Sequence, residues 1–173
     1  MHGVRVIESP VINSDETRAI FHELDVDLGL SLGNGYIAKS VFSIPRCGMI
    51  NIHAEVLPDF QGAPSVIWPI HENLETTGYT IHQIDKGIDT GEILLLRQYP
   101  IELRRTLRET VEANVARSNQ DIPVDMCRVV ANYGAVKAAA TVQSGGSSYT
   151  TPSCREFLRM RRNHARMARR ESD

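Results

Sequence analysis

Short apolar runs separated by polar and glycine-containing stretches fill the first hundred residues, and this pattern is typical of strands joined by loops and helices. The polar segment that Ser14 or Asp15 caps predicts a helix over residues 14–24. Because this helix alternates with apolar runs, we expect an α/β fold with a mostly parallel sheet flanked by helices. The predicted strands cover residues 4–11, 26–32, 48–53, 79–84 and 93–99.

In the second half of the chain, apolar residues recur every three or four positions, which is typical of helices with one buried face. A helix is also predicted over residues 63–72, where Trp68 is expected to pack, and an extended piece over 138–143. Two stripes in the second half predict two amphipathic helices over one face of the sheet: Leu103, Leu107, Val111 and Val115, then Met126, Val130 and Tyr133.

The composition is that of one soluble globular domain, with 173 residues, 42% hydrophobic and 23% charged. The formal net charge of −2 gives no general attraction to nucleic acid. Residues 154–173 differ, because seven arginines stand there against three acidic residues. We therefore divide the chain into a domain over 1–150 and an arginine-rich helix or tail over 151–173. Its predicted helix, 156–170, is either a solvated surface or one that attracts phosphate, so a nucleic-acid partner stays open.

The three cysteines, Cys47, Cys127 and Cys154, are far apart and form no Cys-x-x-Cys pair, so we expect free thiols and no disulfide framework. His53-Ala-Glu55 matches part of a zinc-deaminase motif but lacks its cysteine partner, and no metal is expected. The first twenty residues carry several charges, and no apolar run approaches the roughly 18 residues that span a bilayer. We therefore expect a cytoplasmic protein with no membrane partner.

Asn51 and His53 stand two residues apart at the end of the predicted strand 48–53. Side chains at this spacing share one face of a strand and lie roughly 6.5 Å apart along it, so one small reacting group can touch both. Amide and imidazole N–H groups stabilise an oxygen that becomes negative when a carbonyl is attacked. We therefore expect this pair to stabilise an oxyanion.

Asp89 lies in the turn 85–91 between two predicted strands, and a hairpin there would point its carboxylate inward. A carboxylate within about 4–6 Å of His53 would hold the ring protonated and pass protons to or from the reacting centre. The alternative interpretation is structural, with a buried histidine bonded to backbone and a turn shaped by its aspartate and glycine residues. The combination of Asn51, His53 and Asp89 favours catalysis, with none of the three as a nucleophile.

Several spaced motifs follow one another between about residue 6 and residue 100. They are Asn51-x-His53, Leu57-Pro58, Gly62-Ala-Pro64, Trp68, Gly78-x-Thr80-x-His82 and Asp89-Thr-Gly91. This order of motifs resembles the formyltransferases that use 10-formyltetrahydrofolate. That family includes glycinamide-ribonucleotide, methionyl-tRNA and amino-sugar formyltransferases, together with formyltetrahydrofolate deformylase. The resemblance implies a Rossmann-like sheet and identifies residues 1–150 as a formyltransferase-like catalytic domain.

The resemblance also implies roles for individual residues. In the family an acceptor amine attacks the formyl carbon directly, while Asn, His and Asp stabilise the tetrahedral intermediate and move protons. These roles fall on Asn51, His53 and Asp89, with His82 supporting Asp89. Gln143 and Tyr149 correspond to tail residues that lie near the acceptor in some members. The residues implied to bind the folate are Gly35, Tyr36, Ile37, Leu57, Pro58, Asp85, Gly87 and Ile88.

Three features depart from the family pattern. Glu55 replaces a serine and is expected to place a carboxylate near the edge of the folate site. Gln61 replaces an arginine, which weakens any contact to an acceptor carboxylate or phosphate. Fifty residues precede Asn51, fewer than is usual, so the first strand, its glycine-containing turn and the next helix are expected to be missing. The expected fold is therefore N-terminally shortened, with an exposed sheet edge.

The leading hypothesis is transfer of a formyl group from 10-formyltetrahydrofolate to an acceptor amine. An amino-sugar nucleotide is preferred as acceptor, because the segment after the sheet is short and no tRNA-binding domain is evident. Methionyl-tRNA and glycinamide ribonucleotide stay open. The alternatives are hydrolysis of formyl-folate, with water in place of the amine, and a folate- or partner-binding remnant without full activity.

Overall fold

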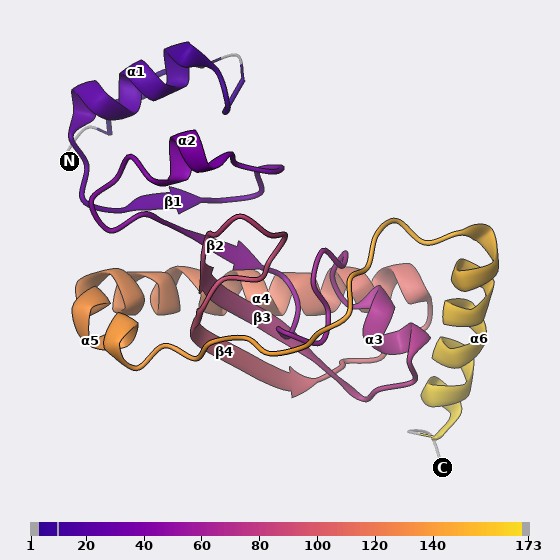
Figure 1. The fold of residues 1–173 in the computed structure, drawn as a ribbon. Helices are drawn as coiled ribbons and strands as arrows, with labels where there is room; N and C mark the ends of the chain where they lie inside the picture. The colour runs from indigo at the N-terminus through magenta and orange to yellow at the C-terminus, as the bar shows by residue number, and fades with distance from the viewer. Residues whose placement is uncertain (1–3, 10, 171–173) are drawn as a thin grey trace.

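The computed structural model describes residues 4–9 and 11–170 as a four-stranded sheet with helices around it, in the strand order β1-β2-β3-β4 (Figure 1). The long helix α4 lies behind the sheet, α1 and α2 lie beside β1, and α3 and α6 lie to the right in Figure 1, beyond the end of β4. The elements are α1 Asp15–Leu24, β1 Gly29–Ser31, α2 Lys39–Phe42, β2 Met49–His53, α3 Ile67–His71, β3 Thr76–Gln83, β4 Ile93–Pro100, α4 Leu107–Ala131, α5 Tyr133–Ala138 and α6 Cys154–Arg170.

The α/β class predicted from the sequence is confirmed, and within it the sheet is mixed rather than mostly parallel. β1 pairs in parallel with β2, and the connection between them contains α2. β2 with β3 and β3 with β4 are antiparallel pairs. Parallel strands need a crossover connection, whereas the loop 84–92 turns the chain directly back from β3 to β4. Whether each pair of strands is parallel or antiparallel therefore follows from the connection between the two strands.

The start of the chain differs from the prediction. Residues 4–9 and 11 belong to no strand, and residue 10 of the predicted strand lies outside the described residues. Val4 and Val6 are 87% and 83% exposed, because these apolar side chains have no sheet to pack on. The helix that follows is confirmed as α1, and its cap is the Ser14 hydroxyl, which accepts a backbone N–H three residues on at 3.1 Å.

One continuous helix, α4, covers the back of the sheet where the sequence predicts two helices. It opens with a capping box at Thr106. The helix continues through the polar stretch between the two apolar stripes, because buried polar side chains there have partners on and after β4. The Asn114 amide donates to the Glu102 carbonyl at 3.0 Å, and Ser118 bonds the Tyr99 hydroxyl.

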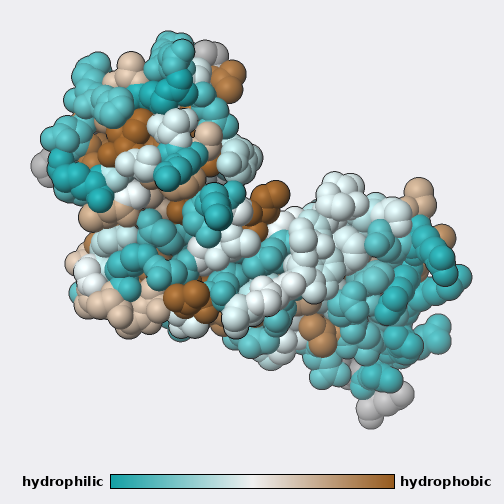
Figure 2. All heavy atoms as spheres, in the orientation of Figure 1, coloured by the Kyte–Doolittle hydropathy of each residue, from teal (hydrophilic) through white to brown (hydrophobic). Residues whose placement is uncertain are grey.

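α6 confirms the arginine-rich helix predicted near the end of the chain, and residues 171–173 of the predicted tail lie outside the described part. Its inner face packs on α3. The Asn163 amide donates to the carbonyls of Ile70 and His71 at 3.0 and 2.7 Å, and Met160 is fully buried. Hydrophilic side chains cover the outer face of this region, at the lower right of Figure 2.

Trp68 packs as predicted, in a cluster that ties the segment before α6 to the body of the protein. Its ring centroid lies 4.6 Å from that of Tyr149, and its Nε1 donates to the Thr150 carbonyl at 3.1 Å. Tyr149 also packs against Phe60, with centroids 5.3 Å apart. The tyrosine therefore contributes to packing in this structure.

The cysteines are free, as predicted, and all three are exposed. Among the helices in the described ranges, none is long and apolar enough to cross a membrane.

Candidate active site

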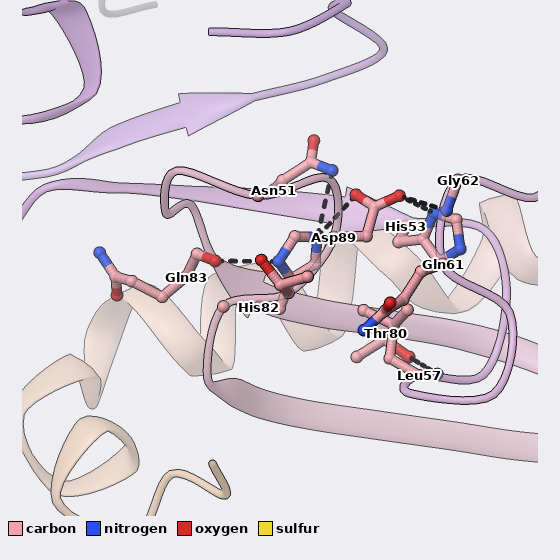
Figure 3. A network of polar contacts seen from close by, with 12 residues as sticks. Asn51, His53, Leu57, Gln61, Gly62, Thr80, His82, Gln83 and Asp89 are labelled. Carbon is pink, nitrogen blue, oxygen red and sulfur yellow. Dashed lines mark hydrogen bonds and ion pairs between the residues drawn. The ribbon is translucent and has the colours of Figure 1, made fainter. Parts of the chain in front are cut away.

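A cleft of about 280 Å³ opens beside the ends of β1 and β2, and Asn51, His53 and Asp89 all line it (Figure 3). Asn51 and His53 come from β2, His82 lies opposite Asn51 on β3, and Asp89 comes from the loop after β3. The antiparallel pairing of β2 with β3 places His82 in the same cleft. The structure therefore brings together the three residues that the sequence singled out.

The His53 ring lies between Asp89 and the backbone. Its Nε2 donates to the Phe60 carbonyl at 2.7 Å, and its Nδ1 lies 3.2 Å from Asp89 Oδ2. A carbonyl oxygen only accepts, so Nε2 carries a proton. Both ring nitrogens are thus engaged within the protein. Any hydrogen bond from His53 to a substrate oxygen has to come from an Nδ1–H that is shared with Asp89.

His82 faces the other oxygen of the same carboxylate. Its Nε2 lies 3.3 Å from Asp89 Oδ1, and its Nδ1 lies 2.9 Å from the Gln83 carbonyl, which places a proton on Nδ1. The support for Asp89 predicted for His82 is confirmed by this contact. Asp89 is held between two imidazoles that are each anchored on a backbone carbonyl, so a proton can be held on either side of the carboxylate.

Burial and charge oppose each other in this cluster. Burial raises the pKa of Asp89, but His82, His53 and the Gly62 N–H together outweigh it, so the pKa lies below its ordinary value. Burial lowers the pKa of His53, and the charge of Asp89 and the Phe60 carbonyl only partly offset this. Asp89 is therefore ionised at neutral pH, and His53 gives up its second proton more easily than an exposed histidine. His53 and Asp89 lie as close together as predicted, but burial lowers the His53 pKa more than the charge of Asp89 raises it.

Asn51 supplies the amide of the site. Its Nδ2 lies 3.3 Å from His82 Nε2, and the residue is half-buried in the wall of the cleft. An amide nitrogen carries two hydrogens, so the contact with His82 uses at most one of them. Asn51 therefore has an N–H with which to stabilise a developing negative charge on an oxygen in the cleft.

Asp89 is fixed by its own backbone and by a second loop. Its φ angle is 54°, in the left-handed region that residues other than glycine rarely adopt. The Gly62 N–H donates to its Oδ2 at 2.9 Å (Figure 3). Gly62 itself has φ 70°, and a Cβ there would lie 2.8 Å from the Tyr149 carbonyl, so the position requires glycine. The prediction missed this donor, and the glycine in Gly62-Ala-Pro64 was its signal.

Most of the residues predicted to bind the folate line the same cleft as the trio. Asp85 shapes its loop, because its carboxylate accepts the Gly87 N–H at 2.9 Å and the Thr90 hydroxyl at 2.6 Å. Other residues that the sequence did not single out also line the cleft. The predicted residues in the cleft are Gly35, Tyr36, Ile37, Asp85, Gly87 and Ile88, and the additional ones include Ser31, Asn34, Ala63 and Ile84.

The structure differs from the predicted folate site at Leu57 and Pro58, because neither residue lines this cleft. Leu57 is only 2% exposed, and its N–H donates to the Thr80 hydroxyl at 3.1 Å, which holds it in the interior beside β3. The Pro58 carbonyl faces Gly146, where an added Cβ would lie 2.5 Å from it. The chain after β2 therefore turns into the protein.

Glu55 is also placed differently from the expectation. It is fully buried, and its carboxylate accepts hydrogen bonds from the Val66 N–H, from the Thr77 hydroxyl at 2.8 Å and from the Val56 N–H at 3.3 Å. Burial raises its pKa to about 7, which these hydrogen bonds partly offset. The extra carboxylate therefore supports the start of α3 instead of the edge of a ligand site.

Among the described residues, no group of three or more His, Cys, Asp or Glu side chains could hold a metal ion.

The fold and the cleft define an α/β protein whose amide, imidazole and carboxylate groups gather beside the ends of two sheet strands. The profile of the family described as formyl transferase matches residues 13–127. The chain belongs to this family.

Two relatives show how far the likeness extends. The methionyl-tRNA formyltransferase of Geobacter metallireducens is 38% identical over 58% of this chain and 32% of its own length. That of Thermosynechococcus vestitus is 32% identical over 72% of this chain and 38% of its own length. The chain thus spans about a third of the length of these curated relatives.

Solved structures share the fold. The formyltransferase PseJ of Anoxybacillus kamchatkensis, solved with a UDP-linked formamido sugar and tetrahydrofolate, superposes with a TM-score of 0.58 and 27% identity over 78% of this chain and 69% of its own. The phosphoribosylglycinamide formyltransferase of Bacillus halodurans gives a TM-score of 0.51 and 27% identity over 61% of this chain and 53% of its own.

Proposed function

We propose that this protein transfers a formyl group from 10-formyltetrahydrofolate to an acceptor amine. The observation that carries the proposal is the position of Asp89, ionised and held between His53 and His82 in the cleft that Asn51 also lines. Membership of the formyl transferase family supports it. Formyl transfer needs a binding site for the donor, a group that stabilises negative charge on the formyl oxygen and a group that accepts a proton.

The cleft suits a flat, partly apolar ring of the kind that a folate carries. Tyr36 and Ile88 line it and are 58% and 61% exposed, so large apolar side chains are open to a ligand. Gly35 has open space around it, which leaves its backbone groups accessible for the polar edge of a pterin. The folate donor would lie between residues 35–37 and residues 85–88, with its formyl group toward Asn51.

The residues of the chain then divide the chemistry. Asn51 donates a hydrogen bond to the formyl oxygen as it becomes negative, and His53 adds positive charge beside it when its ring holds a second proton on Nδ1, next to Asp89. The attacking amine becomes positively charged as its bond to the formyl carbon forms. The Asp89 carboxylate, directly or through water, accepts the proton that this nitrogen loses. A proton passes to N10 of the folate as the bond between N10 and the formyl carbon breaks, which releases tetrahydrofolate and the formylated amine. His82 keeps the carboxylate in place throughout.

The acceptor that we propose is an amino-sugar nucleotide. The likeness to PseJ, which was solved with a UDP-linked sugar, supports this choice, because it extends over 78% of this chain at 27% identity. Gln61 stands where many family members have arginine, so a phosphate would have to bind elsewhere along the cleft.

The test is a formyl-transfer assay with formyl-folate and a panel of amines, comparing the wild type with Asn51→Ala and Asp89→Ala. Loss of one oxyanion donor is expected to lower kcat by about 10²–10³-fold, and Asp89→Ala by a similar factor. The exposed Glu8→Gln variant serves as a control and is expected to behave as the wild type. Activity of either site variant at the wild-type level would refute the assignment. Release of formate without an amine would instead favour a hydrolase.

A further inference from the structure

The segment between α5 and α6, residues 139–153, crosses the sheet on the side opposite α4 and appears orange in Figure 1. We call it the strap. Thr141 pairs with Ile93 at the start of β4 through two backbone hydrogen bonds of 2.8 and 3.0 Å. Farther along, the Gln61 N–H donates to the Ser147 carbonyl at 3.0 Å, and the Tyr149 N–H donates to the Gln61 carbonyl at 2.8 Å. The strap therefore bonds to the start of β4, which follows the Asp89 loop, and to the loop whose Gly62 N–H contacts the Asp89 carboxylate.

Gln143 is the residue of the strap that reaches the Asp89 loop with its side chain. Its Nε2 donates to the backbone carbonyl of Asp89 at 2.9 Å and to that of Gly91 at 2.6 Å. Its Oε1 accepts from the Gln61 Nε2 at 3.1 Å. The two amide hydrogens therefore both go to the loop that carries Asp89, and the amide oxygen is occupied on the other side.

The orientation of this amide is determined by its partners. If the amide were turned over, its oxygen would face two carbonyl oxygens, while its NH₂ group would face the donating Nε2 of Gln61. The two loop carbonyls, which can only accept, thus fix the orientation in which Gln143 donates to the loop, and the Gln61 amide complements it by donating to the Gln143 oxygen. Gln61 also precedes Gly62, whose N–H bonds the Asp89 carboxylate (Figure 3). The two glutamines therefore connect the Gly62 loop with the Asp89 loop.

Asp89 needs such external support because its backbone adopts an unfavourable conformation. With φ at 54°, a residue other than glycine costs roughly 1 kcal/mol or more relative to an ordinary conformation, unless its surroundings hold it. Its carboxylate also has to meet His53, His82 and Gly62 at the same time, at 3.2, 3.3 and 2.9 Å. Donors on the Asp89 and Gly91 carbonyls fix the peptide unit that follows Asp89 and the one that follows Gly91.

We propose that Gln143 is a positioning residue, which holds the backbone of the Asp89 loop so that the carboxylate stays between the two histidines. Its effect on catalysis rests on the proposed formyl transfer. Its effect on the geometry of the cluster does not, because the contacts of Asp89 with His53 and His82 are present in the protein alone.

Two variants of Gln143 test the proposal against a matched control. Gln143→Met keeps the length of the side chain but donates nothing, and Gln143→Glu puts a carboxylate against the two carbonyls. The control is Gln98→Glu, an exposed glutamine on β4 whose amide bonds the Thr76 hydroxyl at 2.8 Å. We expect both Gln143 variants to lower kcat by about 10–100-fold, because a displacement near 1 Å at the reacting group costs about that much. The KM for the folate should stay within about threefold, because the Asp85 carboxylate still holds the donor side of the loop through the Gly87 N–H and the Thr90 hydroxyl.

A second readout does not need turnover. In Gln143→Met, the His53 pKa, followed by its ring proton resonances in NMR titrations, should fall below the wild-type value. The charge of Asp89 raises this pKa against burial and against the nearby His82, and a carboxylate that drifts away loses that effect. In Gln98→Glu the titration should match the wild type.

The outcomes separate the two proposals. An inactive wild type whose His53 titration still shifts in Gln143→Met would overturn the proposed function and support the positioning role. An active wild type with kcat and His53 titration unchanged in both Gln143 variants would overturn the positioning role and leave formyl transfer standing. A lower kcat in folded Gln143→Met without any change in the His53 titration would also overturn it, because the carboxylate would then have kept its place.

Discussion

Replacing Glu55 with glutamine tests how much a buried carboxylate contributes to the stability of this protein. Glu55 is fully buried two residues after His53, and Val66, at the start of α3, donates its N–H to Glu55 Oε1. Oε1 also accepts from Thr77, whereas Oε2 has one longer contact, to the Val56 N–H at 3.3 Å. Oε2 is therefore the oxygen that can carry a proton. Glutamine keeps the accepting oxygen and places an uncharged NH₂ where that proton would be.

The size of the effect follows from the pKa of Glu55. Burial raises the pKa from 4.5 to about 7 in the folded protein. Because the folded state binds this proton more tightly than the unfolded chain, the stabilisation is complete below pH 4.5 and is lost as pH rises through about 7. The loss amounts to about 3 kcal/mol, at about 1.4 kcal/mol for each pH unit between the two values. Glutamine cannot ionise, so Glu55→Gln should not show this loss.

The assay is urea unfolding of the wild type and of Glu55→Gln at several pH values from 5 to 8. We expect similar free energies of unfolding at pH 5 and a variant that is more stable at pH 8, by up to about 3 kcal/mol. Glu8→Gln, which alters an exposed carboxylate, should follow the wild type at every pH. A constant difference between wild type and Glu55→Gln across this range would refute the reasoning, because it would show that Glu55 ionises equally in both states.

Two further predictions concern the site and the packing of α6. The pKa of Asp89 lies below its ordinary value, so its ionised form stabilises the fold above the unfolded pKa, and this contribution is lost as pH falls through the folded value. Asp89→Asn should therefore lose less stability than the wild type on acidification, as followed by circular dichroism, and an identical acid transition would contradict this. Met160 is fully buried between α6 and the body of the protein, so Met160→Ala should cost about 2–5 kcal/mol in chemical unfolding, whereas Leu158→Ala, at a half-exposed position on the same helix, should cost much less. Equal costs for the two would show that α6 does not pack on α3 in solution.

Local patterns along the chain were enough to predict several elements. The serine cap of α1, the strands β2, β3 and β4 and the arginine-rich α6 all follow from signals within a few residues. The apolar residues at 4–11 show the limit of such signals. An alternating apolar pattern forms a strand only where a neighbouring strand pairs with it, and Val4 and Val6 have no sheet to pack on. In α4, buried polar side chains whose partners lie on and after β4 made one helix from two predicted ones.

By itself, the sequence determined the chemical groups of the site, because Asn51, His53 and Asp89 occur in motifs whose order the family shares. Only the tertiary structure decided how these groups act on one another. It put His82 against Asp89, buried Glu55 under α3, and joined Gln143 to a carbonyl 54 residues earlier in the chain. The physical reason is that a residue's charge state and fixed position depend on desolvation and on hydrogen bonds from distant segments. Those partners come together only in the folded protein, where the sheet and the strap bring distant segments into contact.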